Sequence, residues 1–455
     1  MKARQRAAAF SVSLAILASL SLAAGARADW PQFRGWQASG VSATAKPPLT
    51  WDVVNGTNLL WRQPVPGLAH ACPIVWSNRI YLATVTRPGT KPQLKVGLYG
   101  DGDSYSEKVP HQWRLLCFDA GQGKILWDKI GFESVPRLER HTKATQCNST
   151  PATDGQRLVA IFGSEGLFCF DMAGQLLWRQ DLGKLHSAPH DQPNYQWGFA
   201  SSPILHEGKV VVQVDTYTEQ YVGVFDATDG REVWRRPRKD KGTWCTPIVA
   251  TNGGRTQVIA NGWKEIGGYD FKTGTPLWWL SEGGDIPVAS PILGGDFVLL
   301  TSAHGKYRPM RAVRLNAVGN IQPPDLSLTN QAIAWCHPRK GNYLQTPIVV
   351  GEFLWGGSND GIVTCFNLRT GQIYYEERIG GGGQGFTASP IAANGHLYFT
   401  GEQGDVFVLP ATNTFRVVAK NRLGGLCLST PAVVGDTLLF RTTEELLAVG
   451  TRAAK

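Results

Sequence analysis

Residues 225–234 read Phe-Asp-Ala-Thr-Asp-Gly-Arg-Glu-Val-Trp, and close variants of this stretch recur along the chain. Residues 269–278 read Tyr-Asp-Phe-Lys-Thr-Gly-Thr-Pro-Leu-Trp, and residues 118–127 read Phe-Asp-Ala-Gly-Gln-Gly-Lys-Ile-Leu-Trp. In each copy an aromatic residue ends a β-prone run, Asp and Gly suit a tight turn, and a tryptophan follows in the next run. The stretch therefore predicts two antiparallel strands joined by a short turn.

A second motif gives the number of repeats. A small or polar residue followed by proline and an aliphatic residue occurs eight times, at Pro73, Pro151, Pro203, Pro247, Pro291, Pro347, Pro390 and Pro431. The spacings are 78, 52, 44, 44, 56, 43 and 41 residues, and the first is long because it contains an insertion at about 86–112. A fixed period of this length indicates a repeat architecture.

Each proline except the last is followed by four β-prone runs separated by turns, and no segment shows an extended helical period. Four strands per repeat, eight times over, predict an all-β, eight-bladed β-propeller of four-stranded antiparallel blades. Residues 58–61 form a fourth strand without the preceding three, whereas the last repeat, from Pro431 to Val449, has three strands and lacks the fourth. We therefore expect the N-terminal strand to complete the last blade and close the ring, because closure removes both exposed sheet edges, which a linear solenoid would have to cap.

The first 28 residues predict an export signal. Three basic residues precede an uncharged run at 7–24, and Ala26-Arg27-Ala28 has the small-x-small pattern of a cleavage site. We expect cleavage after Ala28, then an extended leader at 29–57, the propeller at 58–450 and a tail at 451–455. The predicted location is periplasmic or secreted, and no later stretch reaches the roughly 20 apolar residues that span a bilayer.

The charge of the expected mature chain is mild. Without the signal, the 45 basic residues fall to 41 against 36 acidic ones, which leaves a net charge of +5. No run of lysine or arginine stands out, so a nucleic-acid partner is not expected.

Eight cysteines in an exported chain raise the question of disulfides. There is no adjacent pair and no Cys-x-x-Cys, and Cys117, Cys169 and Cys365 occupy one repeat position inside β-prone runs. This distribution favours buried thiols over a dense disulfide framework, and it leaves the disulfide pattern open.

The unit at 225–234 resembles the tryptophan-docking repeat of quinoproteins. The chain from 29 to 450 resembles PQQ-like, quinoprotein-type β-propeller repeat proteins related to the outer-membrane assembly factor BamB, and Asp-Trp-Pro-Gln-Phe-Arg-Gly at 29–35 resembles their leader. In the repeat, the tryptophan should bury its flat ring against the neighbouring blade. The expected docking residues are Trp61, Trp127, Trp178, Trp234, Trp278 and Trp335. Blade 5, where Trp335 lies far from Gly319, and blade 7, which ends in Val417, should have looser interfaces.

The resemblance also implies a test for enzymatic activity. Quinoprotein dehydrogenases hold PQQ between a tryptophan and a disulfide of adjacent cysteines, near a bound Ca²⁺. This sequence has no adjacent cysteines, so PQQ and calcium are not expected, and no catalytic residue or metal site is assigned.

Two further motifs match only part of a known binding site, and neither is assigned as one. Gly380-x-Gly382-x-x-Gly385 matches a dinucleotide fingerprint but leads into a strand, where the fingerprint needs a helix. The Asp101–Asp103 loop resembles part of a Ca²⁺ loop but lacks the distal glutamate of an EF-hand.

Strand order places the long loops on one face of the ring. The insertion at 86–112 and the loops at 128–148 and 179–200 should share that face, where binding usually occurs. The candidate ligand- or partner-binding residues at the channel mouth and on this face are His70, Asn148, His186, His190, Trp197, Trp244, Tyr343 and Phe386. Aromatic rings would stack on a ligand while His and Asn donate hydrogen bonds. The alternative is that these residues plug the channel and satisfy one another.

We therefore expect a non-catalytic, exported, monomeric binding scaffold that engages a protein or an extended ligand, with envelope assembly as one form of that role. The alternative is a quinoprotein-like enzyme that binds a cofactor or a carbohydrate at the channel mouth.

Overall fold

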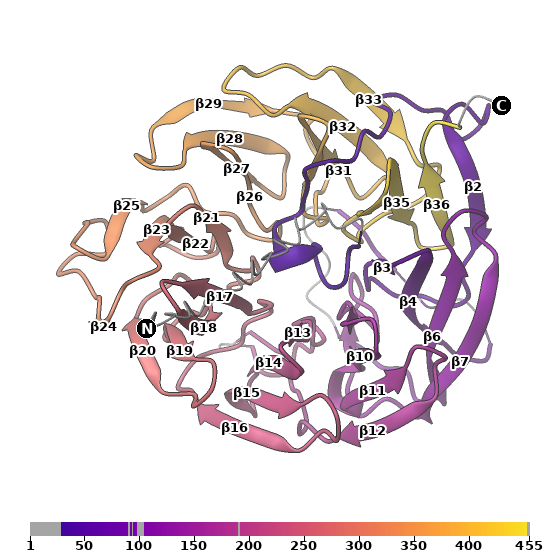
Figure 1. The fold of residues 1–455 in the computed structure, drawn as a ribbon, viewed down its shortest axis with the longest axis horizontal. Coiled ribbons are helices and arrows are strands. Elements are labelled where there is room, and N and C mark those ends of the chain that lie inside the picture. Colours follow the sequence, from indigo (N-terminus) through magenta and orange to yellow (C-terminus); the bar gives the residue numbers. More distant parts are fainter. Residues whose placement is uncertain (1–28, 90–91, 93, 98–103, 190–191, 453–455) are drawn as a thin grey trace, which may run out of the picture.

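The computed structural model describes residues 29–89, 92, 94–97, 104–189 and 192–452. Eight antiparallel sheets stand around a central axis like the blades of a propeller (Figure 1). The predicted eight-bladed, all-β fold is thereby confirmed. The expected signal at 1–28 lies outside the described residues, as do His190 and the Asp101–Asp103 loop.

The first four blades follow one another along the chain. Blade 1 consists of β3 (Ile74–Trp76), β4 (Arg79–Thr86), β6 (His111–Asp119) and β7 (Ile125–Ser134). Blade 2 consists of β9 (Ala152–Thr153), β10 (Arg157–Ile161), β11 (Leu167–Asp171) and β12 (Leu176–Gln180). Blade 3 consists of β13 (Ile204–His206), β14 (Lys209–Asp215), β15 (Gln220–Asp226) and β16 (Glu232–Pro237). Blade 4 consists of β17 (Ile248–Asn252), β18 (Arg255–Ala260), β19 (Ile266–Asp270) and β20 (Pro276–Leu280).

The second half repeats this order. Blade 5 consists of β21 (Ile292–Gly294), β22 (Phe297–Thr301), β23 (Met310–Arg314) and β25 (Ile333–His337). Blade 6 consists of β26 (Ile348–Val350), β27 (Phe353–Gly357), β28 (Ile362–Asn367) and β29 (Ile373–Arg378). Blade 7 consists of β30 (Ile391–Ala393), β31 (His396–Thr400), β32 (Asp405–Pro410) and β33 (Ala419–Arg422). Blade 8 consists of β34 (Ala432–Val434), β35 (Thr437–Arg441), β36 (Glu445–Val449) and β2 (Leu59–Pro64).

Blade 8 joins the two ends of the repeat region, because β2 pairs antiparallel with β36 in the register Arg62↔Leu447. Short elements extend other parts of the ring: β1 (Val41–Ser42) pairs with β30, β24 (Gly319–Asn320) pairs with β20, and β5 (Ser104–Tyr105) pairs with β8 (Arg140–His141). Two short 3-10 helices complete the list, η1 (Trp36–Ala38) and η2 (Gly163–Glu165).

The core lies between adjacent blades rather than in one central layer. In blade 3, Val211 and Val224 pack against Val258 and Tyr269 of blade 4. The inner strands therefore read as nearly continuous apolar runs, because both faces of each blade are covered by a neighbour. All eight cysteines are unpaired, and seven of them are buried. Within the described ranges no helix is long and apolar enough to cross a membrane.

The residue before each repeat proline forms part of a closed belt of hydrogen bonds. In every blade its backbone N–H donates to the side chain of the equivalent residue in the next blade, at 2.9–3.2 Å. The members are Cys72, Thr150, Ser202, Thr246, Ser290, Thr346, Ser389 and Thr430. At seven joints the acceptor is a hydroxyl, and at the joint between blades 8 and 1 it is the thiol of Cys72. The small polar residue of the motif thus links each blade to its neighbour.

Four of the six expected docking tryptophans donate an Nε1 hydrogen bond to a carbonyl in a turn of the next blade, at 2.9–3.0 Å: Trp61 to Ala120, Trp178 to Ala227, Trp234 to Phe271 and Trp335 to Leu368. The ring then lies against the turn's glycine. Gly230 has φ +74°, and a Cβ there would lie 2.6 Å from the Trp178 ring. Trp335 thus docks like Trp61, Trp178 and Trp234, although in the sequence it lies far from Gly319 of its own blade.

Trp278 and Trp127 depart from this pattern. The Nε1 of Trp278 donates to Gln257 of its own blade, because blade 5 replaces the short turn with the long connection that contains β24. Among the described residues, the Nε1 of Trp127 has no hydrogen-bond partner. The facing turn of blade 2, from Asp171 to Gly174, is one residue shorter than the turns Asp119–Gly123, Asp226–Gly230 and Asp270–Gly274.

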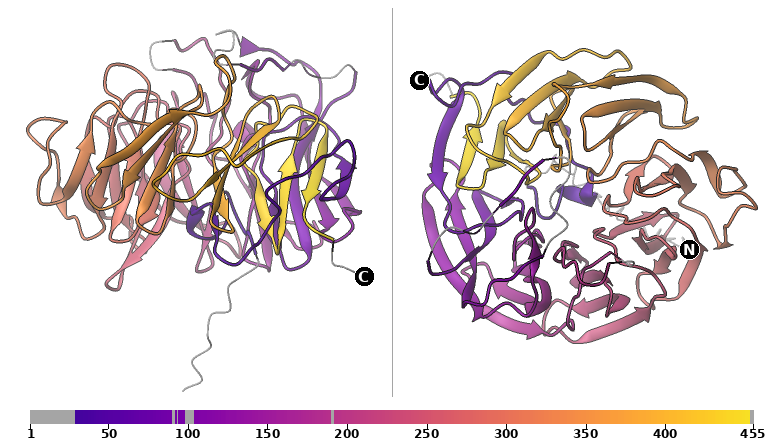
Figure 2. Two further views of the ribbon diagram at one scale, coloured as in Figure 1. Left: turned by 90° about the horizontal axis from the view of Figure 1, so that it is seen from above. Right: turned by 180° about the vertical axis from the view of Figure 1, so that it is seen from behind.

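The two faces of the ring differ. The turn between the first and second strands of a blade contacts the turn between its third and fourth strands, as in the hydrogen bond from Ala227 N to Gly208 O in blade 3. We call this side the turn face and the opposite side the loop face. Figure 2 shows the segments around β5 and β8 rising above the loop face. The predicted loop at 128–148 is shorter than expected, because β7 continues to Ser134.

The leader crosses the centre of the ring, where Figure 1 shows η1. Arg34 is 1% exposed, and its guanidinium donates to the carbonyls of Thr346 and Pro347 at 2.8 Å each. Leader carbonyls accept hydrogen bonds from Val75 of blade 1, Thr153 of blade 2 and Ala392 of blade 7. The leader then leaves along the turn face, where the N–H of Lys46 donates to Asp436. It therefore ties together blades that lie on opposite sides of the ring.

Candidate functional site

On the loop face, an ion pair connects two segments that are far apart in the sequence. Lys143, in the connection from blade 1 to blade 2, lies 2.6 Å from Glu402 of blade 7. The same carboxylate accepts a hydrogen bond from the backbone of Gly97 at 2.8 Å and from the hydroxyl of Thr387 at 2.5 Å. Glu402 is fully buried. The blade 1 insertion is therefore fastened across the mouth of the central channel.

A buried charge cluster anchors the base of that insertion. Glu107 accepts a hydrogen bond from Arg140 Nε at 3.0 Å and lies 3.5 Å from His111 Nε2. Burial alone would raise the pKa of Glu107, but the hydrogen bonds from His111 and Arg140 outweigh it and lower the pKa to about 2. The carboxylate is thus ionised at neutral pH and holds β5 and β8 against blade 1.

Three of the predicted site residues lie at the mouth of the channel and bond to other parts of the protein. The Nε2 of His70 lies 2.9 Å from the carbonyl of Lys143, and burial lowers the pKa of His70 to about 4, so this ring is neutral. The Nδ2 of Asn148 donates to the carbonyl of Phe199 at 3.2 Å. Phe386 is fully buried.

Four other predicted residues, Trp197, Trp244, Tyr343 and His186, form aromatic pairs on this face. Trp197 and Trp244 have ring centroids 5.4 Å apart, and Trp244 Nε1 donates to the carbonyl of Gly198 at 2.8 Å. Tyr343 lies beside His304, and His186 lies beside Tyr217, with centroids 5.5 and 5.2 Å apart. Trp197, Tyr343 and His186 remain partly exposed. The structure therefore brings the set to one face but does not gather it around a single hollow.

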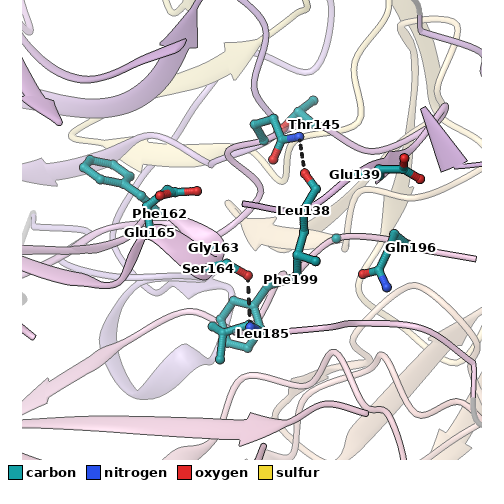
Figure 3. Close-up of a pocket in the computed structure, with 12 residues that line it drawn as sticks. Leu138, Glu139, Thr145, Phe162, Gly163, Ser164, Glu165, Leu185, Gln196 and Phe199 are labelled. Carbon is teal, nitrogen blue, oxygen red and sulfur yellow. Dashed lines mark hydrogen bonds between the residues drawn. The ribbon is translucent and has the colours of Figure 1, made fainter. Parts of the chain in front are cut away.

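The best-formed cavities on this face are small. One lies over blade 2, between the connections that lead into and out of that blade, and Figure 3 shows Glu139, Glu165 and Gln196 among the residues that line it. The space open to the centres of water molecules is about 20 Å³, which suits one or two waters. The other lies over Glu107 and Arg140, with about 10 Å³ of such space. Neither could enclose a cofactor with several rings.

Sequence reasoning missed a second buried charge network, between blades 3 and 4. The side chains of Arg238, Asp215 and Asp240 are fully buried, and the guanidinium lies 2.8 Å and 2.9 Å from the two carboxylates. Burial and the charge of Asp215 raise the pKa of Asp240 to about 7. Asp240 also accepts backbone N–H groups of Trp263 and Lys264. The network orders the loop-face segments of both blades, and its signal in the sequence is Asp215 at the end of a valine-rich run.

The residues present do not fit the PQQ and calcium site of quinoprotein dehydrogenases. No two cysteines are adjacent, so the disulfide wall of that site cannot form. Among the described residues, no group of three or more His, Cys, Asp or Glu side chains is arranged to hold a metal ion. The glycine-rich stretch at 380–385 leads into β30 and not into a helix, so it offers no helix N-terminus to a phosphate.

Solved structures share this fold at low sequence identity. BamB from Moraxella catarrhalis is 15% identical with a TM-score of 0.54, over 80% of this chain and 98% of that chain. A europium-containing methanol dehydrogenase is 11% identical with a TM-score of 0.55, over 90% of this chain and 89% of that chain. An assembly factor and an enzyme thus share one propeller, so the likeness identifies the fold alone. A comparison with curated protein sequences finds no match.

A family model described as outer membrane protein assembly factor BamB matches residues 112–377, from the third strand of blade 1 to the outer strand of blade 6. This match covers more than half of the chain and includes five of the six docking tryptophans, all except Trp61. The chain therefore belongs to this BamB-like family of PQQ-like β-propellers.

Proposed function

We propose that the chain is a non-catalytic, exported scaffold whose loop face binds a protein partner in the cell envelope. The observation that carries this proposal is the asymmetry of the ring. Most long connections gather on the loop face, whereas the opposite face has mainly short turns and the leader across its centre. Loops held on a rigid scaffold are the usual place for binding.

The character of the loop face supports a macromolecular partner. The two cavities described above have room for only a few waters, whereas Tyr217 and His304 stand out from this face, each nearly half exposed. Protein interfaces use such protruding aromatic groups on a broad surface and do not need a deep pocket. Membership of a family named for outer-membrane protein assembly supports a partner in that process.

The proposal is tested by capturing partners from an envelope extract and then measuring the affinity of the purified partner. The double variant Tyr217→Glu/His304→Glu places charge on the loop face, and we expect it to weaken binding at least about tenfold, because charged residues are depleted from interface cores. The matched control is Lys272→Glu/Arg369→Glu, which changes exposed residues in turns of the opposite face.

The control should bind like the wild type. Loss of binding in the control, with full binding in the loop-face variant, would show that the interface lies on the turn face and would contradict the proposal. The quinoprotein-like alternative is tested by adding PQQ and Ca²⁺: retention of the quinone absorbance after desalting, together with dye-linked alcohol oxidation, would replace the scaffold by an enzyme.

A further inference from the structure

The outer strand of blade 3 is an open sheet edge. β16 is the last strand of its sheet, and among the described residues no strand pairs with its outer side. Figure 1 shows β16 at the rim of the ring. Five of its six residues are exposed, and Trp234 is the exception. An edge strand presents unpaired backbone N–H and C=O groups, with which another chain can pair.

The backbone groups that face outward belong to alternate residues of β16. The N–H of Arg238, just after the strand, donates to the carbonyl of Gln220 at 3.0 Å, and Arg236 pairs with Val222 in the ladder. Because the backbone groups of successive residues point to opposite sides of a strand, those of Arg236 face β15 and those of Arg235 face away from the sheet. Arg235 therefore offers one donor and one acceptor to an added strand.

This edge also carries an excess of positive charge. Residues 231–241 contain six basic and two acidic residues. Arg238 and Asp240 form a buried pair, which leaves five basic residues and one acidic residue, Glu232, all of them exposed. The outer side of blade 3 is thus suited to a negatively charged partner.

Arg236 is the basic residue of β16 that has no ionic partner. Arg235 pairs with the neighbouring glutamate of the same strand at 2.8 Å, whereas no hydrogen bond or ion pair within the described ranges reaches the guanidinium of Arg236. On blade 7, both basic residues of the outer strand, Lys420 and Arg422, lie near the carboxylate of Asp405, at 3.2 and 3.4 Å. The uncompensated charge is therefore found at β16 and not at β33.

The neighbouring blade shows that such an edge accepts a further strand. β24 pairs in parallel with β20, the outer strand of blade 4, in the register Trp278↔Gly319. The N–H of Ile321 then donates to the carbonyl of Trp279 at 3.0 Å. Figure 1 places β24 at the same outer rim on which β16 lies. An extended segment can thus lie along the outside of this ring and continue the sheet of a blade.

We propose that the edge of β16 binds an acidic, extended segment of a protein partner, which becomes a fifth strand of blade 3. Strand addition is a common mode of peptide recognition, in which the main chain supplies hydrogen bonds and the side chains supply specificity. The backbone of the segment would pair with Arg235, and its carboxylates would pair with Arg236. The arginines disfavour a second copy of β16 on this edge, because like charges on facing strands repel.

The first test measures peptide affinity by fluorescence polarisation with the full chain. The probe is a labelled, amidated hexapeptide that alternates glutamate and valine, and the wild type should bind it saturably. Arg236→Glu should weaken binding at least about fivefold, because it replaces attraction by repulsion at an exposed site. The matched control Arg416→Glu reverses an exposed charge just before β33, and it should leave the affinity unchanged.

The second test separates strand addition from attraction between charges. The peptide should slow amide hydrogen exchange at Arg235, followed by NMR, because its outward N–H gains an acceptor. A fully N-methylated peptide keeps the carboxylates but has no backbone N–H. It should bind at least about tenfold more weakly, because the main-chain hydrogen bonds that it would donate are lost.

Equal affinity of the methylated peptide, or equal weakening by Arg416→Glu, would overturn the proposal, because charge alone would then explain binding. A wild-type dimer in sedimentation that Arg236→Glu abolishes would identify a second copy as the occupant. Binding to phosphatidylglycerol vesicles through Arg236, without peptide binding, would identify a lipid surface. Either result would refute the acidic segment, whereas the loop-face variant tests the proposed function separately.

Discussion

At the scale of single residues, Cys72 is the exception in the hydrogen-bonded belt, because it offers a thiol where the other blades offer a hydroxyl. Cys72→Ala removes the acceptor of the Thr430 N–H, which is buried, and this should cost about 1–3 kcal/mol of unfolding free energy. Cys72→Ser also removes the sulfur but supplies a hydroxyl like that of Ser202 or Ser290. The serine variant should therefore exceed the alanine variant in stability by that amount, as measured by urea denaturation.

Equal stability of the two Cys72 variants would show that the belt contributes little at this joint. The belt also marks a limit of sequence reasoning. The pattern of a small or polar residue before proline gave the correct number of blades. It did not reveal that the polar side chain accepts a hydrogen bond from the preceding blade, because that partner lies 41 to 78 residues away at seven joints and 358 residues away at Cys72.

At the scale of elements, the insertion of blade 1 depends on an ionised carboxylate. The pKa of Glu107 is lowered from 4.5 to about 2 in the folded protein. Because the unfolded chain takes up this proton more readily, the stabilisation is complete above pH 4.5 and is lost as the pH falls through about 2. The shift corresponds to about 3 kcal/mol. The wild type should exceed Glu107→Gln in stability at pH 6, and the gap should close between pH 4.5 and 2.

Unfolding free energies of both proteins at several pH values measure this gap, with Glu133→Gln as the control, since Glu133 is an exposed residue of the same blade. A gap that stays constant down to pH 2 would contradict the role of the Glu107 charge.

The leader and the insertion were only partly predictable. The sequence indicated their extents, but not that Arg34 donates to carbonyls of blade 6 or that Lys143 pairs with Glu402 of blade 7. Such contacts follow from the closed shape and not from any local pattern. Likewise, the mouth residues His70 and Asn148 were expected from their place before the inner strands, whereas the small cavity lined by Gln196 depends on how three separate segments pack together.

At the scale of the whole molecule, the closing blade should be as strong as any other joint. Trp61 and Trp178 provide a matched pair, because each donates its Nε1 hydrogen bond to an alanine carbonyl at 3.0 Å and lies against a turn glycine. Trp61 belongs to β2, the strand that joins the two ends of the repeat region, whereas Trp178 lies within the continuous chain. Both Trp→Ala variants should lose about 3 kcal/mol of unfolding free energy. A loss below about 1 kcal/mol for Trp61→Ala alone would show that the contact between blades 8 and 1 is weaker than the contact between blades 2 and 3. The ring would then open first between blades 8 and 1.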